Sequence, residues 1–153
     1  MRRLGLLGLL PFVIPAIGVW MAPWALPMRF ALELHQMALV YAGIIAAYLA
    51  GVGAGGLLLS RERTAEGVLP GMIAALVAWL AIWQGGPLVY VFGAAWRYAI
   101  LVGVFVYLYA RDRRAAAAGA LPGWYGALRA RLTFWATLSL VAIMSRLILW
   151  GYY

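Results

Sequence analysis

Long apolar runs separated by short polar segments make up most of the chain. A helix needs ~20 apolar residues to cross a hydrocarbon core of ~30 Å, so each run is a candidate membrane span. The segment "APWALPMRFALELHQ" (22–36) is expected to be an interfacial loop, because two prolines interrupt it. The predicted spans cover about residues 4–21, 34–59, 68–83, 88–110 and 132–150. The turn "QGGP" (84–87) is so short that the third and fourth spans should form an antiparallel hairpin.

Composition strengthens this interpretation. Of the 153 residues, 67% are hydrophobic and only 10% are charged. A soluble domain of that size has too little interior to bury so much apolar surface. The predicted fold class is therefore an all-α membrane protein, with a bundle of five transmembrane helices that forms a single domain over residues 1–153.

The segment "LPGWYGALRARLT" (121–133) differs from the spans, because arginines alternate in it with aromatic residues and leucines. Pro122 suits the first turn of a helix, and Arg129 and Arg131 would face anionic lipid headgroups. We expect a short cytoplasmic interfacial helix here, which anchors the chain to membrane lipids. Docking of a partner protein is the alternative.

The formal charge of +8 includes twelve arginines. Apolar runs separate these arginines instead of leaving them in one patch, which argues against nucleic acid as a partner. Nine fall on one side of the predicted membrane, Arg29 alone on the other, and Arg97 and Arg146 within spans. The positive-inside rule then places the N-terminus in the cytoplasm and the C-terminus in the periplasm of a bacterial inner membrane. No small-x-small cleavage site follows the basic start, so a retained first span is expected instead of a signal peptide.

The stretch "LAGVGAGG" (49–56) contains the spacing G-x-G-x-x-G. A dinucleotide site needs such glycines on a turn between a strand and a helix, whereas these lie inside a predicted span. Helix packing explains them better, since helices in lipid associate by close backbone approach across small residues. One column of small residues runs through Gly43, Ala47, Gly51 and Gly55, and a neighbouring column through Ala46, Ala50 and Ala54. The partner of these columns could be a helix of this chain or of another protein.

Three stretches resemble, in the same order, the signatures of the transmembrane protein 69-like family, also described as domain of unknown function 3429. They are "LGLLGLLPFV" (4–13), "YAGIIAAYLAGVGAG" (41–55) and "LPGWYGALRARLT" (121–133), and the resemblance spans nearly the whole chain. The middle signature of that family usually has a bulky polar or aromatic pair where this sequence has Gly53 and Ala54. The resemblance implies a five-span bacterial or mitochondrial inner-membrane protein, and it brings no established activity.

Arg97 and Arg146 are the first candidates for a functional site. A charge near mid-span costs ~2.5–3.5 kcal/mol on insertion scales, so it normally faces protein or water and has a partner. Arg97 lies near the middle of the fourth span and Arg146 in the outer half of the fifth, while Glu33 lies at the outer end of the second. The arginines could be bonded to Glu33, to the C-terminal carboxylate or to carbonyls freed by proline. They could also bind an anionic ligand, or contact another subunit.

His35 lies close to Glu33, and it is the one histidine of a chain without cysteine. Such a residue could ligate a metal or a tetrapyrrole, but at a helix entrance it is more often a hydrogen-bonding residue. The sequence also lacks a nucleophile, histidine and acid constellation, a carboxylate pair within a span and a phosphate loop. We therefore expect no metal site, no cofactor and no enzymatic activity.

Small size, short loops and the small-residue columns favour a non-catalytic integral membrane protein. Its expected partners are membrane lipids and other membrane-protein subunits. It would be an accessory subunit or assembly factor of a larger inner-membrane complex, respiratory or photosynthetic. The alternative is a small transporter or binder of an anionic ligand or lipid that uses Arg97 and Arg146. A polar cavity beside both arginines would favour this alternative.

Overall fold

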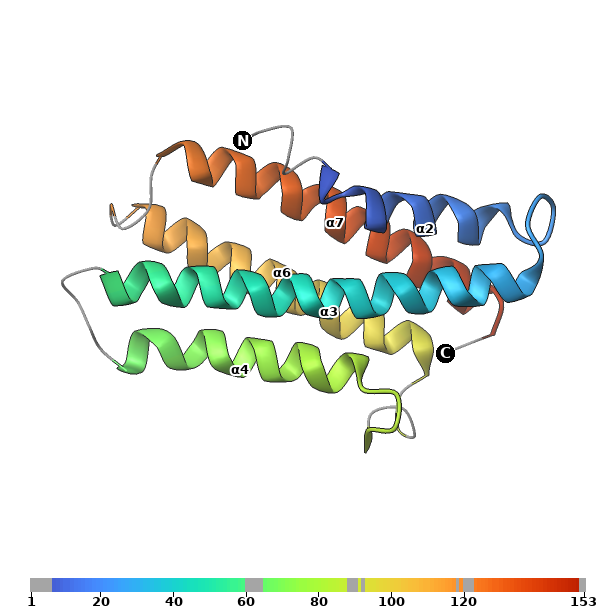
Figure 1. Cartoon of the computed structure of the whole chain (residues 1–153), viewed down its shortest axis with the longest axis horizontal. Helices are drawn as coiled ribbons and strands as arrows, with labels where there is room; N and C mark the ends of the chain where they lie inside the picture. Colours follow the sequence, from blue (N-terminus) through green and yellow to red (C-terminus); the bar gives the residue numbers. More distant parts are fainter. Residues whose placement is uncertain are drawn as a thin grey trace.

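The computed structural model describes residues 7–59, 65–87, 91, 93–117, 119 and 123–151. In these ranges five long helices lie along one axis (Figure 1). They are α2 (Leu10–Met21), α3 (Met28–Leu59), α4 (Ala65–Ile82), α6 (Ala94–Ala117) and α7 (Gly123–Leu149). The expected all-helical bundle is therefore confirmed for this part of the chain.

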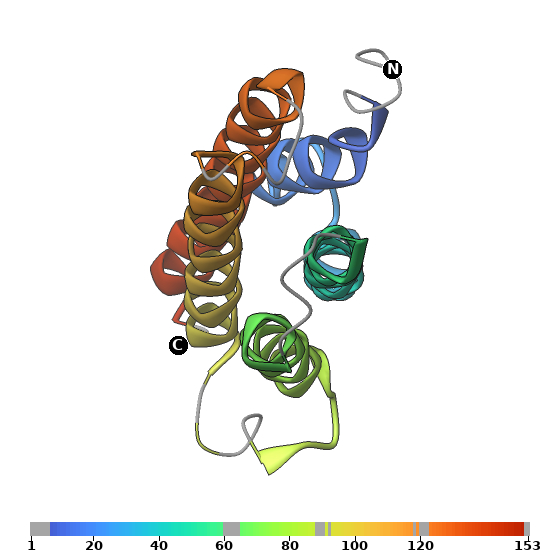
Figure 2. The same ribbon diagram turned by 90° about the vertical axis from the view of Figure 1, so that its left-hand side faces the viewer.

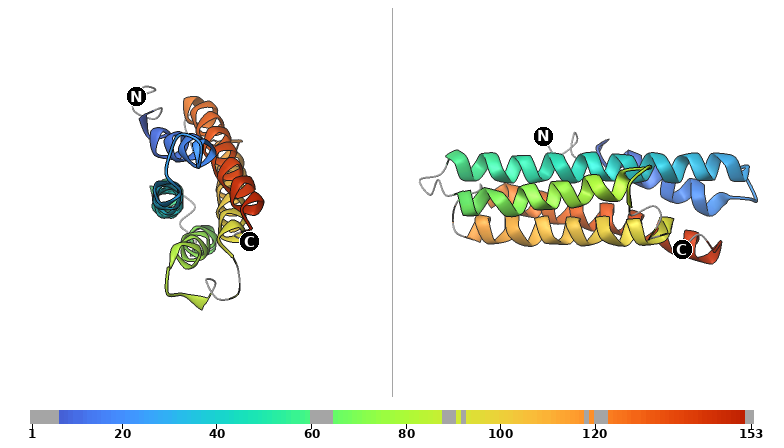
Figure 3. Two further views of the ribbon diagram at one scale, coloured as in Figure 1. Left: turned by 90° about the vertical axis from the view of Figure 1, so that its right-hand side faces the viewer. Right: turned by 90° about the horizontal axis from the view of Figure 1, so that it is seen from below.

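Successive helices run in alternating directions, which gives the bundle two ends (Figure 1). We call one the Arg111 end, where α3 and α6 end and α4 and α7 begin. The other is the Arg146 end, where α2, α4 and α7 end and α3 and α6 begin. Viewed along the axis, the helices form a ring in the order α2, α3, α4, α6 and α7, with α3 also contacting α6 across the centre (Figures 2 and 3).

Small residues let α3 and α4 approach closely. Every fourth residue on one face of α3 is a buried alanine, and α4 presents alanines toward it with similar spacing. The buried alanines are Ala38, Ala42, Ala46 and Ala50 on α3 and Ala74, Ala78 and Ala81 on α4. Four residues make slightly more than one helical turn, so each set lies on one side of its helix.

Larger side chains fill the centre of the ring. Phe12 from α2 makes edge-on contacts with Tyr41 of α3 and Phe105 of α6, with ring centroids 5.1 and 6.0 Å apart. Leu101 and Leu108 are fully buried on the same side of α6 as Phe105. The inward side of α6 therefore follows the spacing of an amphipathic helix, while its sequence is apolar around most of its circumference.

The outside of the bundle is rich in large apolar side chains. On α4 and α7 the exposed ones are Leu69, Met72, Ile73, Leu76 and Trp79, and Phe134, Trp135, Leu138, Val141, Ile148 and Leu149. Among the described residues, Met28–Gly56 and Tyr125–Leu149 are long and apolar enough to cross a membrane, judged by length and composition, and Leu10–Met21 and Gly67–Ile82 are shorter apolar helices. Membrane association is therefore plausible on structural grounds.

Several boundaries differ from the prediction. The span expected over 88–110 is described as α6 at Ala94–Ala117, so Arg97 lies in the first turn of this helix instead of near its middle. α3 begins at Met28, so the interfacial loop expected over 22–36 is reduced to about 22–27, and Glu33 and His35 lie inside the helix. The separate interfacial helix is wrong, because residues 123–149 form one continuous helix. No described residue between these bounds is a proline that would break it, and Arg129 is drawn into the bundle by a buried partner described below.

Candidate functional site

Arg97 at the Arg146 end is directed into the bundle. Arg97 is only 5% exposed, and its Nε donates a hydrogen bond to the carbonyl oxygen of Ala81, 2.6 Å away. Ala81 lies in the last turn of α4, where carbonyls lack a helical partner and the helix dipole is negative. The Nη2 of Arg97 is buried without a hydrogen-bond partner among the described residues. The side chain therefore ties α6 to the end of α4.

Arg146 has a similar but separate role. Its Nη2 donates to the carbonyl oxygen of Ala22, 2.7 Å away, at the C-terminal cap of α2. Its guanidinium carbon also lies 5.3 Å from the ring centroid of Trp20 and 4.8 Å from that of Trp150. Contacts of this kind are favourable because the face of an aromatic ring is electronegative. Arg146 therefore joins the ends of α2 and α7, and among the described residues its hydrogen-bond acceptor differs from that of Arg97.

Glu33 and His35 are placed differently from each other. Glu33 is exposed, and among the described residues no ion pair joins it to either arginine. His35 is buried, with its Nδ1 3.4 Å from the hydroxyl oxygen of Tyr98, and that hydroxyl donates to the His35 carbonyl at 2.5 Å. The described residues contain no group of three or more metal-ligating side chains. His35 thus helps to join α3 to α6, and the C-terminal carboxylate considered for Arg97 lies outside the described residues.

A buried charge cluster occupies the Arg111 end, which sequence reasoning missed. The Arg129 Nε donates to the Asp112 carboxylate at 2.8 Å, and the Arg111 Nη2 lies 3.9 Å from its other oxygen. Asp112 and Arg129 are each only 4% exposed. The sequence predicts that these residues lie in charged segments at the membrane surface, whereas in the structure they join α6 to α7.

The helical spacing contains the signal for this cluster. Asp112 continues the inward series of α6 that includes Leu101, Phe105 and Leu108. Arg129 likewise begins the inward series of α7 that continues through Thr133. A charged residue at an inward position of each of two neighbouring helices predicts an ion pair. The inward position of Asp112 is easily overlooked, because all four residues of "RDRR" are charged.

Arg111 lies in a slot between two glycines. A Cβ atom on Gly53 of α3 would overlap Nη2 of Arg111, and one on Gly71 of α4 would overlap its Nη1. The Nη2 also donates a long hydrogen bond of 3.4 Å to the carbonyl of Ala50. The middle glycine of the G-x-G-x-x-G stretch therefore makes room for a guanidinium group, which supports the rejection of a dinucleotide site.

Comparison with known proteins adds the family. The family model described as "protein of unknown function (DUF3429)" matches residues 1–145. The chain belongs to the DUF3429 family. The match includes Arg97, Arg111, Asp112 and Arg129, and it ends one residue before Arg146. No curated protein and no solved structure matches this DUF3429 protein.

The predicted small-residue column is used only in part inside this DUF3429 chain. A Cβ on Gly43 would lie 2.6 Å from the Ile82 side chain, so Gly43 packs against α4. Ala47 and Gly51 are exposed, and Gly51 and Gly55 have no atom within 4 Å of where a Cβ would lie. In the neighbouring alanine column, Ala46 and Ala50 are buried inside the bundle. A contact of Ala47, Gly51 and Gly55 with another protein stays a prediction.

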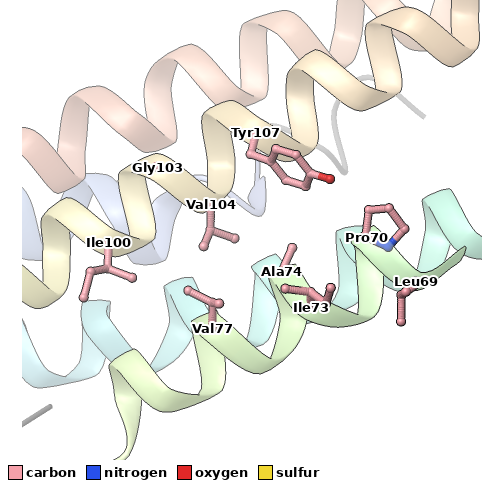
Figure 4. Close-up of a pocket in the computed structure, with 9 residues that line it drawn as sticks. All are labelled: Leu69, Pro70, Ile73, Ala74, Val77, Ile100, Gly103, Val104 and Tyr107. Atoms are coloured by element: carbon pink, nitrogen blue, oxygen red, sulfur yellow. The ribbon is translucent and has the colours of Figure 1, made fainter. Parts of the chain in front are cut away.

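An apolar groove of about 500 Å³ lies between α4 and α6 of the DUF3429 protein (Figure 4). It is lined by Leu69, Pro70, Ile73, Ala74 and Val77 from α4 and by Ile100, Gly103, Val104 and Tyr107 from α6. Gly103 has no atom within 4 Å of the position of a Cβ, so backbone is accessible there. Neither Arg97 nor Arg146 lines this groove.

Proposed function

We propose that the protein is a non-catalytic integral membrane protein that acts as an accessory subunit or assembly factor of a larger inner-membrane complex. The observation that carries this proposal is the inverted polarity of the bundle. Its outer face exposes large apolar side chains, while arginines and an aspartate lie inside. A surface of this kind suits lipid and the apolar surfaces of other membrane proteins.

The proposed location is a bacterial inner membrane with the Arg111 end in the cytoplasm. That end has Arg113, Arg114 and Arg131 as exposed arginines, and Arg29 is exposed at the opposite end. The positive-inside rule favours this orientation. The proposed inner-membrane location agrees with the resemblance to transmembrane protein 69-like proteins. A reporter fused after Tyr153 that is active in the periplasm would support it, and one active only in the cytoplasm would contradict it.

The groove between α4 and α6 is the proposed contact for a transmembrane helix of a partner subunit. Gly103 and Ala74 leave room for close backbone approach, and in lipid such approach is the main source of helix association. The groove is open along two helices that expose apolar side chains on either side of it (Figure 4). The small-residue column at Gly51 offers a second surface for the same kind of contact.

The test is purification of the tagged full chain in nanodiscs that retain native lipid, followed by mass spectrometry of the proteins that remain bound. Gly103→Leu and Gly51→Leu are matched variants, because each glycine faces open space. Loss of a bound membrane protein with Gly103→Leu alone supports the groove, and loss with Gly51→Leu alone supports the column. If no membrane protein accompanies the unmodified chain above the level of an untagged control, the proposal is wrong.

The alternative, transport or binding of an anion by Arg97 and Arg146, has weaker support. Each of the two guanidinium groups already donates to a backbone carbonyl at the end of a helix. Neither borders any of the three cavities described in the structure. Anion binding is better supported at the other end of the bundle.

A further inference from the structure

A small cavity of about 200 Å³, with charged and aromatic residues in its lining, lies between the end of α6 and the start of α7. Its principal lining residues are Tyr109, Asp112 and Arg113 of α6 and Tyr125, Gly126 and Arg129 of α7. Since a water molecule occupies ~30 Å³ in the liquid, the cavity has room for a group several times that size. It adjoins the buried charge cluster, because Asp112 and Arg129 belong to both.

Among the residues that the structure describes, the charges around the cavity do not balance. The Asp112 carboxylate is faced by both Arg111 and Arg129, so the buried cluster has an excess of one positive charge. Arg113 adds an exposed positive charge at the lining of the cavity. Among the described residues, no second carboxylate forms an ion pair with these arginines.

The excess charge has unused hydrogen-bond donors. Arg129 is 4% exposed, and its Nη2 is buried without a partner among the described residues, as is the Nη1 of Arg111. A buried charged donor without a partner is costly, because it has lost water and gained nothing in exchange. An anion that accepts from Arg129 would remove this cost and neutralise the cluster.

We propose that the cavity binds a phosphate group through Arg129 and Arg113. Guanidinium groups present planar pairs of donors that match phosphate oxygens, and a group with several acceptor oxygens can contact both arginines. Arg129 also borders a second, apolar cavity of about 180 Å³ whose lining includes Phe12, Tyr41 and Leu132. The phosphate can therefore come from a lipid headgroup, with its acyl chain on the apolar side, or from free phosphate.

The experiment uses the full chain in dodecylmaltoside micelles, which contain no phosphate. Binding of inorganic phosphate and of short-chain phosphatidylglycerol is measured separately, by native mass spectrometry and by the shift in Tm. Saturable binding of either probe supports the site. Binding of phosphatidylglycerol without binding of inorganic phosphate identifies the lipid headgroup as the source, and binding of inorganic phosphate that displaces the lipid identifies free phosphate. Binding of neither probe overturns the proposal.

Three variants test the residues. Arg113→Gln removes a donor outside the ion pairs that join Asp112 to Arg111 and Arg129. Arg129→Lys keeps a cation beside Asp112 while it removes the Nη2 donor. We expect each to weaken binding roughly tenfold, which corresponds to about 1.4 kcal/mol. The control is Arg114→Gln, which is exposed like Arg113 but does not line the cavity. It should change binding by less than about twofold, because a charge without direct contact acts on the phosphate only through electrostatics that salt screens. Equal weakening by Arg113→Gln and Arg114→Gln would indicate general surface attraction and overturn the site.

Discussion

The two ends of the bundle hold buried arginines by different means. At the Arg146 end, Arg97 and Arg146 donate to carbonyls in the last turn or cap of α4 and α2. At the Arg111 end, Arg111 and Arg129 share the carboxylate of Asp112. Carbonyl groups supply partial negative charge and fix one helix against another, whereas a carboxylate neutralises a full charge. At the Arg111 end, the pairing of both arginines therefore depends on the carboxylate of Asp112 alone. At the Arg146 end, each arginine has its own backbone carbonyl as a partner.

Asp112→Asn should produce the largest effect on this comparison. The substitution keeps the size of the side chain but leaves two arginines, one of them almost fully buried, without a carboxylate. Removing one partner of a buried pair typically costs about 3–5 kcal/mol. We expect a fall of that order in the free energy of unfolding, measured by denaturant titration in micelles. Glu33→Gln is the control, because Glu33 is exposed, and an equal loss in both variants would contradict the dependence on Asp112.

Arg97→Leu should have a smaller effect. It removes the hydrogen bond to the Ala81 carbonyl, and bonds from charged donors contribute about 1.5–3 kcal/mol. The loss is partly offset, because the variant also removes the unpartnered Nη2 from the interior. We expect a decrease of about 1–2 kcal/mol in the free energy of unfolding, measured in the same micelles.

The double variant Arg97→Leu with Glu33→Gln sharpens this result. The structure shows no ion pair between the two side chains in the described part of the chain, so the two effects should add to within about 0.5 kcal/mol. A coupling energy well above that value would indicate that Arg97 does pair with Glu33, as the sequence suggests. The Arg146 end would then also hold a buried arginine by means of a carboxylate.

Gly53→Ala should give the smallest effect of the three. Its Cβ would overlap the guanidinium group of Arg111, which is the far end of a flexible side chain and can shift at a cost of about 1 kcal/mol. Gly51→Ala is the matched control on the same helix, where no atom lies within 4 Å and alanine is the better helix former. Thermal unfolding of both variants in micelles checks the difference. A Gly51→Ala variant that is less stable than Gly53→Ala would show that the slot is not filled by Arg111.

The helices were predictable from sequence because each is a long apolar run with a polar or glycine-rich boundary. The partners of the buried arginines were harder to predict. The sequence suggested Glu33, the C-terminal carboxylate or carbonyls freed by proline as partners of Arg97, but any helix end supplies free carbonyls. Which end comes close depends on the packing of α4 against α6. Nothing in the sequence around Ala81 therefore indicates that its carbonyl accepts a hydrogen bond from Arg97.

The buried cluster was missed for a different reason. Arg111, Asp112 and Arg113 read together as a polar boundary, although only Asp112 continues the inward spacing of α6. The sequence also left open which helix the small-residue column of α3 contacts, because four-residue spacing identifies a face of a helix without saying what covers that face. The bulky residues of neighbouring helices decide that, as Ile82 does for Gly43.

The slot around Arg111 bears on the order in which the bundle can be completed during synthesis. Gly53 and Gly71 belong to α3 and α4, but the atoms that occupy the space between them belong to a side chain near the end of α6. A ribosome makes α3 and α4 first, so their hairpin has an unfilled gap at this end until the chain has grown from Ile82, where α4 ends, to Arg111, 29 residues later. The guanidinium group of Arg111 therefore fills this gap late in synthesis, and the hairpin reaches its final packing only after α6 has joined it.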